Sequence, residues 1–155
     1  VSARDEKYAP SQISAFTLAH TTTLGLAAAG VIAPPASIVE PLIALTIAWA
    51  ALENILFREP SAWRPALVFG FGLIHGMGFA GAFGDLGLPP GIFWPALIGF
   101  NIGVELGQLA VIAAAYLGVR LWFGRHPKYR GRVAIPASVT IAMIGGYWFV
   151  ERVFL

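Results

Sequence analysis

The chain has 155 residues, of which 57% are hydrophobic and only 12% are charged. A soluble domain carries roughly one-quarter charged residues, so this composition excludes an ordinary soluble protein and indicates an integral membrane protein. The absence of cysteine excludes disulfides, thiolate metal sites and thiol redox chemistry.

Apolar stretches long enough to cross a bilayer, which takes about 20 residues, recur five times along the chain. We therefore predict an all-α, polytopic membrane helical bundle that forms a single domain over residues 1–155. Prolines lie between the stretches, where turns are needed. The expected helices are Gln12–Ile32, Ile38–Phe57, Trp63–Phe83, Ile92–Phe123 and Val133–Leu155.

Basic residues predict the orientation of this bundle. If the helices alternate in direction, nine of the ten lysines and arginines fall on one side, and only Arg152 falls on the other. By the positive-inside rule, the N-terminus of the chain is then cytoplasmic and the C-terminus lies outside. The nine residues are Arg4, Lys7, Arg58, Arg64, Arg120, Arg125, Lys128, Arg130 and Arg132.

The first residues, VSARDEKYAPSQ, are polar and lack the basic and then apolar pattern of a signal peptide. The chain also begins with Val1 instead of an initiator methionine. We therefore expect it to start partway through a longer protein.

Ionisable and amide side chains lie inside several of these apolar stretches. Each is costly in hydrocarbon unless it faces a partner or a wet cavity, so such a residue is by default a functional-site hypothesis. Counting the helical rise of 1.5 Å per residue places them in the middle and cytoplasmic half of the membrane. They are His20, Glu53, His75, Asn101 and Glu105.

The fourth expected helix carries Asn101, Glu105 and Gln108 at spacings of four and three, which places them on one face. Thr17, His20 and Thr21 share a face of the first helix in the same way. Asn54 lies beside Glu53 in the second helix. These residues extend the polar set to four helices.

Glycines indicate where helices approach closely. Gly99, Gly103 and Gly107 lie roughly opposite the polar face of the fourth helix, and we expect another backbone to pack there. Gly72 and Gly76 flank His75, and they are best explained by something that comes close to the backbone around this histidine.

Structural explanations stand beside the functional ones. Asn101, Gln108 and the threonines are typical of hydrogen bonds between helices, and Glu53 is within reach of Arg58 or Arg64 at the membrane surface. His75 and Glu105 are also compatible with a buried pair that orients the bundle. Glu40 and Asp85 are expected to be solvated carboxylates at helix ends.

The donor set favours a narrow chemistry. Two imidazoles with carboxylate and amide oxygens, and no thiolate, suit Ni²⁺, Co²⁺ or Zn²⁺, and they suit a proton relay equally well. No serine lies deep in the first four helices near either histidine, so hydrolysis is not expected and we predict that the chain is not an enzyme.

Four motifs in order carry a resemblance to a known family: FTLAHTTTL, EPLIALTIAWAALENIL, FGFGLIHGMGFA and FNIGVELGQL. Together they cover about Ser14 to Gln108, and they resemble the second branch of the HupE/UreJ membrane proteins. The resemblance implies a nickel or cobalt permease, or an accessory protein of hydrogenase or urease. The residues that match the family's polar positions are His20, Glu53, Asn54, His75, Asn101, Glu105 and Gln108.

The family begins with a helix that bears a His and a Gly-x-Asp-His element, and no such pattern precedes FTLAH here. The resemblance therefore implies a further helix upstream of Val1 and a site that this chain holds only in part.

Our leading prediction is a Ni²⁺ or Co²⁺ permease of the bacterial cytoplasmic membrane, with lipid and a divalent metal ion as its partners and no nucleic acid. His20, His75 and Glu105 are the predicted metal ligands. The alternative is a non-transporting membrane subunit of a larger respiratory, photosynthetic or metalloenzyme complex. A third reading makes His20 and His75 the axial ligands of a b-type haem. The predicted second shell or pathway comprises Thr17, Glu53, Asn54, Asn101 and Gln108.

Overall fold

The computed structural model describes residues 3–57, 62–89, 91–123 and 129–155. Within these residues it is entirely helical, as predicted, and contains no strand. A five-residue π-helix, η1, leads directly into the last α-helix. The elements are α1 (Ala3–Ala28), α2 (Ala36–Leu56), α3 (Arg64–Gly84), α4 (Phe93–Phe123), η1 (Arg130–Ala134) and α5 (Ile135–Phe154).

Four of these helices are long and apolar enough to cross a membrane: α2, α3, α4 and the continuous η1 and α5 segment. This chain is therefore a multi-pass membrane protein in contact with lipid. The first helix, α1, does not reach the same apolarity within the described residues. Its sequence interrupts the apolar pattern with serine, threonine, glutamine and histidine. Its place as a fifth span stays a prediction.

The first helix begins before the expected Gln12 and ends before the expected Ile32. It ends because Gly30 takes a positive φ of 73°, which glycine adopts without steric cost. The Gly30 N–H then donates to the Ala27 carbonyl and the Val31 N–H to the Leu26 carbonyl, at 3.0 and 2.9 Å. These two bonds form a Schellman motif, which closes the helix four residues before the predicted end.

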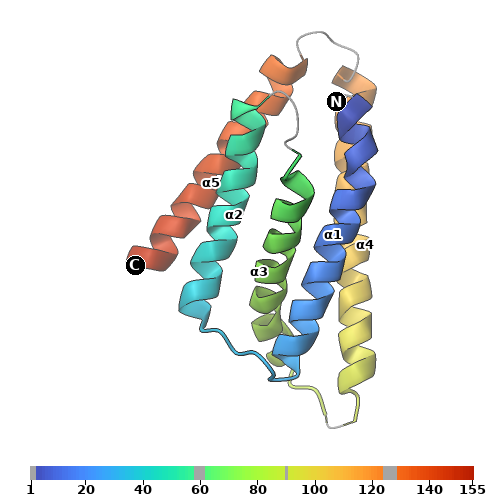
Figure 1. Ribbon diagram of the computed structural model, residues 1–155, viewed down its shortest axis with the longest axis vertical. Coiled ribbons are helices and arrows are strands. Elements are labelled where there is room, and N and C mark those ends of the chain that lie inside the picture. Colours follow the sequence, from blue (N-terminus) through green and yellow to red (C-terminus); the bar gives the residue numbers. More distant parts are fainter. Residues whose placement is uncertain (1–2, 58–61, 90, 124–128) are drawn as a thin grey trace.

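The helices alternate in direction, so the starts of α1, α3 and α5 and the ends of α2 and α4 lie at one end of the molecule (Figure 1). Arg64 and Arg130 belong to this end, and Arg152 lies near the opposite end of α5. This alternation is the arrangement on which the predicted charge asymmetry depends. Most of the other basic side chains lie outside the described part of the structure, so the cytoplasmic assignment stays a prediction.

Helix packing is uneven. The first helix packs most extensively against α3, and α2 packs most extensively against α5, with α2 and α3 joining the two pairs (Figure 1). The fourth helix contacts α1 and α3 mainly near its own start, where Phe93, Leu97 and Phe100 meet Leu24 and Phe83. The remaining large apolar side chains are mostly exposed. Such exposure is the expected state of lipid-facing helices.

Glycines allow the α1–α3 contact to form between backbones. A Cβ at Gly72 would lie 2.6 Å from the Phe16 carbonyl oxygen, and one at Gly76 would collide with the His20 carbonyl oxygen and Thr23 Oγ1. Across the same contact, Thr23 Oγ1 donates a hydrogen bond of 2.8 Å to the Leu73 carbonyl. The expected close approach at these glycines is therefore confirmed, and the approaching element is α1.

The glycine prediction for α4 is wrong within the described structure. A Cβ at Gly99, Gly103 or Gly107 would meet nothing within 4 Å. The spacing placed these residues correctly on a common face, but no described helix packs against it. A further close contact between a glycine and a neighbouring backbone lies between α2 and α5, where a Cβ at Gly145 would approach the Ala48 nitrogen to 2.9 Å.

Candidate cation site between α1 and α4

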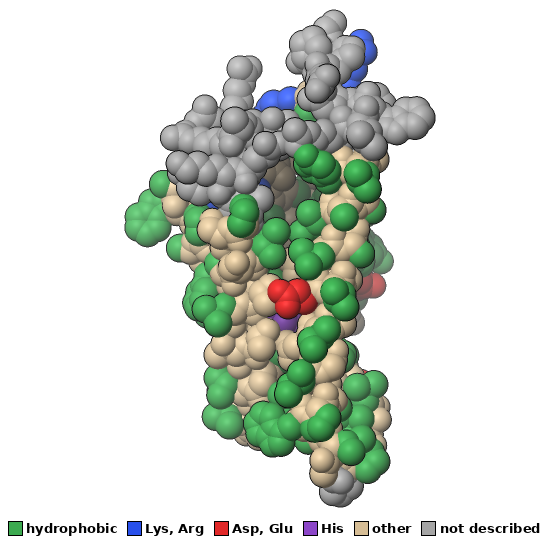
Figure 2. Space-filling model, turned by 90° about the vertical axis from the view of Figure 1, so that its right-hand side faces the viewer, with side chains coloured by type: hydrophobic (Ala, Val, Ile, Leu, Met, Phe, Trp, Pro, Cys, Tyr) green, Lys and Arg blue, Asp and Glu red, His purple; other side chains and the backbone are tan. Residues whose placement is uncertain are grey.

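A small hollow of about 10 Å³, partly open to the outside, lies between α1 and α4. Each helix contributes four residues at spacings of one, three and four, so each contributes one stripe. Figure 2 shows a carboxylate next to a histidine on this face, surrounded mainly by apolar side chains. The lining residues are Phe16, Thr17, His20 and Thr21 of α1, and Asn101, Val104, Glu105 and Gln108 of α4.

The hollow gathers five of the eight residues predicted for the site: Thr17, His20, Asn101, Glu105 and Gln108. The predicted polar stripe of α4 is complete, since all three of its members line the same space. The polar face of α1 points at this stripe.

Unpaired polar atoms concentrate in this hollow. Among the described residues, four buried side-chain atoms have no hydrogen-bond partner: Thr17 Oγ1, Asn101 Oδ1, and both ring nitrogens of His20. All belong to residues that line the hollow. Buried polar groups are nearly always paired, because an unpaired one costs about 1–3 kcal/mol. Four such atoms on residues of one hollow make this hollow the candidate site.

Aromatic contacts, and not hydrogen bonds, hold the His20 side chain in place. Its side chain is only 3% exposed. The imidazole stacks on Phe16 with 5.7 Å between ring centroids and meets the edge of Phe79 at 5.3 Å. The aromatic contacts orient the ring, and both ring nitrogens are buried without a hydrogen-bond partner.

A hydrogen bond within α4 orients the side-chain amide of Asn101. Its Nδ2 donates a hydrogen bond of 2.9 Å to the Leu97 carbonyl one turn earlier in α4. This bond fixes the amide and leaves Oδ1 as the unpaired acceptor. The orientation of the Asn101 amide is therefore set by its own helix and not by a partner across the hollow.

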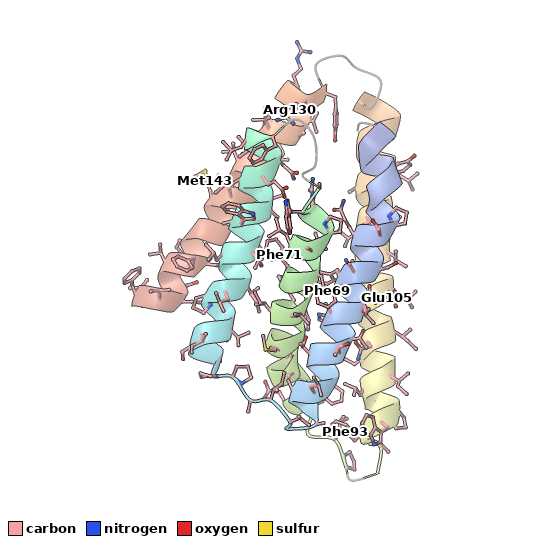
Figure 3. The ribbon with its side chains drawn as sticks, viewed as in Figure 1. Phe69, Phe71, Phe93, Glu105, Arg130 and Met143 are labelled. Carbon is pink, nitrogen blue, oxygen red and sulfur yellow. The ribbon has the colours of Figure 1, made fainter. Side chains whose placement is uncertain are left out.

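Glu105 supplies the charge of the site. Its side chain is exposed and lies midway along α4 (Figure 3). None of the eight lining residues is a lysine or arginine. A carboxylate with no basic residue in the same lining is the charge pattern expected of a cation site, and on this ground we treat the hollow as a candidate cation site.

His75 lies beside this hollow and is not among the residues that line it. Its ring meets the edge of Phe16 at 5.5 Å between centroids, and its Nδ1 lies 2.8 Å from the Phe71 carbonyl. The predicted ligands His20, His75 and Glu105 thus do not share one hollow. Within the described residues, no group of three or more His, Asp or Glu side chains is placed to hold a metal ion.

Glu53 and Asn54 lie apart from the hollow and are bound by Arg64. The Glu53 side chain is 7% exposed, and its Oε2 lies 3.7 Å from Arg64 Nε. Arg64 Nη2 donates a hydrogen bond of 3.1 Å to Asn54 Oδ1. The predicted reach of Glu53 towards Arg64 is therefore present. A role for Glu53 and Asn54 in a cation pathway stays a prediction.

Glu40, expected to be solvated, is exposed but paired: its Oε2 accepts a hydrogen bond of 3.1 Å from Arg152 Nε, which joins α2 to α5. Asp85 is exposed and follows the last residue of α3. Both lie away from the lining of the hollow.

Two lining residues were not predicted: Phe16 and Val104. Phe16 precedes His20 by four residues, and Val104 follows Asn101 by three. Helical periodicity therefore carried a signal for both residues. However, more than half of the residues are hydrophobic, so composition gave no reason to assign these two to the site.

Comparison with known proteins agrees with the motifs. A family model described as HupE / UreJ protein matches residues 5–152. The chain belongs to the HupE/UreJ family. The match extends beyond the four motifs to include α5, and so it covers every described helix of the bundle. No curated protein and no solved structure matches the chain significantly.

For this HupE/UreJ protein the family association is with nickel or cobalt transport, or with an accessory function. The donor types of the hollow agree with that association, because imidazole nitrogen with carboxylate and amide oxygen suits borderline divalent metals.

Proposed function

We propose that this HupE/UreJ protein is a permease that moves a divalent transition-metal cation, of the Ni²⁺ or Co²⁺ class, across the bacterial cytoplasmic membrane. The observation that carries the proposal is the clustering of four unpaired buried polar atoms in one hollow beside Glu105. A structural network would pair such atoms with each other. These atoms belong instead to residues that line one hollow, and none of them pairs with another.

The side chains have distinct roles in this proposal. A ring nitrogen of His20 binds the cation, and the Glu105 carboxylate compensates its charge and supplies an oxygen ligand. Asn101 Oδ1 and Thr17 Oγ1 complete the binding surface with neutral oxygens, and Gln108 extends it. A set with so few charged ligands binds weakly enough to release its cargo, as transport requires.

The test is binding of Ni²⁺ to the purified chain in detergent, measured by isothermal titration calorimetry. We expect His20→Ala and Glu105→Gln each to weaken binding by at least about tenfold. The control is Glu40→Gln, which removes a carboxylate that lies outside the hollow, and we expect it to leave the Kd unchanged.

Cellular accumulation of Ni²⁺, compared at equal expression, tests transport itself. We expect Glu105→Gln and His20→Ala to lower accumulation and Glu40→Gln to leave it at the level of the unmodified protein. Accumulation unchanged in both of the first two variants would contradict the proposal.

A second candidate function, a non-transporting subunit of a larger membrane assembly, has one specific observation in its favour. The glycine face of α4, formed by Gly99, Gly103 and Gly107, has no neighbour in the described structure. Small residues at this spacing are typical of helix-to-helix contacts in membranes. Extraction in a mild detergent as a stable complex with other polypeptides, without Ni²⁺ binding, would favour this candidate.

The haem alternative has less support, because Phe16 contacts both His20 and His75 and a macrocycle between them would have to displace its ring. The absence of a Soret band from the purified protein would exclude it.

A further inference from the structure

Phe16 occupies a singular position: its ring contacts both membrane histidines. It stacks on His20 with an interplanar angle of 15° and meets His75 at 62°, with centroid distances of 5.7 and 5.5 Å. Phe16 and His20 line the hollow, whereas His75 does not. The Phe16 ring is therefore part of the wall between the hollow and His75.

The hydrogen bonding of His75 leaves one of its ring nitrogens, Nε2, able to bind a cation. Its Nδ1 lies 2.8 Å from the Phe71 carbonyl, and a carbonyl can only accept, so Nδ1 carries the proton. In the neutral ring this leaves Nε2 with its lone pair. A hydrogen bond from one ring nitrogen to a backbone carbonyl is the usual support of a metal-binding histidine.

The backbone of Phe16 lies in the close contact between α1 and α3. The carbonyl oxygen of Phe16 lies against Gly72, where even a Cβ would approach it to 2.6 Å, so α1 cannot shift towards α3 here. The Phe16 side chain is only partly buried. Any opening motion at Phe16 would therefore be a change of its side-chain rotamer and not a shift of α1.

We propose that Phe16 is a gate that controls the passage of the cation from the hollow to Nε2 of His75. The proposal rests on the proposed function and adds a second binding position and the element that separates the two. With the ring stacked on His20, the cation is held by the hollow alone. When the ring rotates away, His75 becomes the next ligand on the path.

The experiment uses the full chain reconstituted in proteoliposomes, with Ni²⁺ entry followed by an enclosed fluorescent indicator. We expect Phe16→Leu, which removes the ring, to raise the initial rate by about fivefold, and Phe16→Trp, which enlarges it, to lower the rate by a similar factor. The matched control is Phe93→Leu, since Phe93 is also a partly buried phenylalanine but contacts neither histidine.

Calorimetric binding of Ni²⁺ by the same proteins separates the gate from the site. We expect both Phe16 variants to weaken Ni²⁺ binding by a similar factor of about threefold, because each disturbs the ring that stacks on His20. Opposite rate changes in two variants with similar Kd values support the gate. Rates that change in the same direction in both variants, or that equal the rate of Phe93→Leu, overturn the gate and leave the proposed function standing. An unmodified chain that neither binds nor admits Ni²⁺ overturns both.

Discussion

The polar side chains on the two faces of α1 differ in whether they have hydrogen-bond partners. Towards α3, the helix packs backbone to backbone, and the hydroxyl of Thr23 donates a hydrogen bond to the Leu73 carbonyl. Towards α4, the same helix leaves the Thr17 hydroxyl and the His20 ring without hydrogen-bond partners in the described structure. His20 belongs to both faces, since its carbonyl oxygen lies against Gly76 and its ring reaches the hollow.

The difference separates two uses of polarity within a membrane. Paired polar groups hold helices together, and their number and geometry are set by stability. Unpaired buried groups reduce stability, and they persist where a ligand supplies the missing partner. The contrast is testable because each face offers substitutions with opposite expected signs.

The largest effect is expected at Gly76. Its substitution by alanine places a methyl group against the His20 carbonyl oxygen and Thr23 Oγ1. We expect Gly76→Ala to lower the free energy of unfolding by about 1–3 kcal/mol, as overpacking does. The measurement is reversible unfolding in mixed micelles.

Gly103→Ala is the matched control on α4, where a Cβ meets nothing within 4 Å. We expect it to be neutral, or to stabilise by up to about 1 kcal/mol through helix propensity. Equal destabilisation by both substitutions would contradict the assignment of Gly76 to a close helix contact and of Gly103 to an open helix face.

A smaller effect is expected for Thr23→Val, which keeps the side-chain shape but removes the hydrogen bond to the Leu73 carbonyl. We expect a loss of about 1 kcal/mol in the same unfolding measurement. Thr22→Val is the control, because the exposed Thr22 hydroxyl donates only within its own helix, to the Leu18 carbonyl at 2.7 Å. A loss from Thr22→Val as large as that from Thr23→Val would refute the assigned role of the interhelical bond.

The smallest effect, and one of opposite sign, is expected for Thr17→Val. Removal of an unpaired buried hydroxyl should stabilise the fold by up to about 1 kcal/mol, while Ni²⁺ binding weakens by a few-fold. Thr46→Val serves for comparison, because the Thr46 hydroxyl donates to the Ile43 carbonyl at 2.7 Å and its loss should not stabilise. If Thr17→Val weakened folding and left binding intact, Thr17 would belong to the structural class.

Periodicity in the sequence was sufficient to predict the helices and the polar stripe of α4. The spacing of Asn101, Glu105 and Gln108 depends only on the pitch of an α-helix, and all three line the hollow. The end of α1 was missed by four residues because it depends on the local conformation of Gly30.

Contacts between helices could not be predicted as well, because spacing tells which residues share a face but not what that face meets. The glycines of α3 and of α4 have similar patterns, yet among them only Gly72 and Gly76 of α3 meet a neighbouring backbone. The same limit applies to His75, which was expected beside Glu105 and lies instead against Phe16, outside the lining of the hollow. The pairing of Glu53 with Arg64 was anticipated because the two are close in the chain.

The pairing of α2 with α5 has a consequence for how this protein is made. The main neighbour of α2 is α5, and 78 residues lie between Leu56 and Ile135. At about 5–20 residues per second, α2 therefore spends on the order of ten seconds in the bilayer before that neighbour is synthesised. Arg64 follows Glu53 by only 11 positions, so the buried carboxylate receives its counter-charge early in this interval.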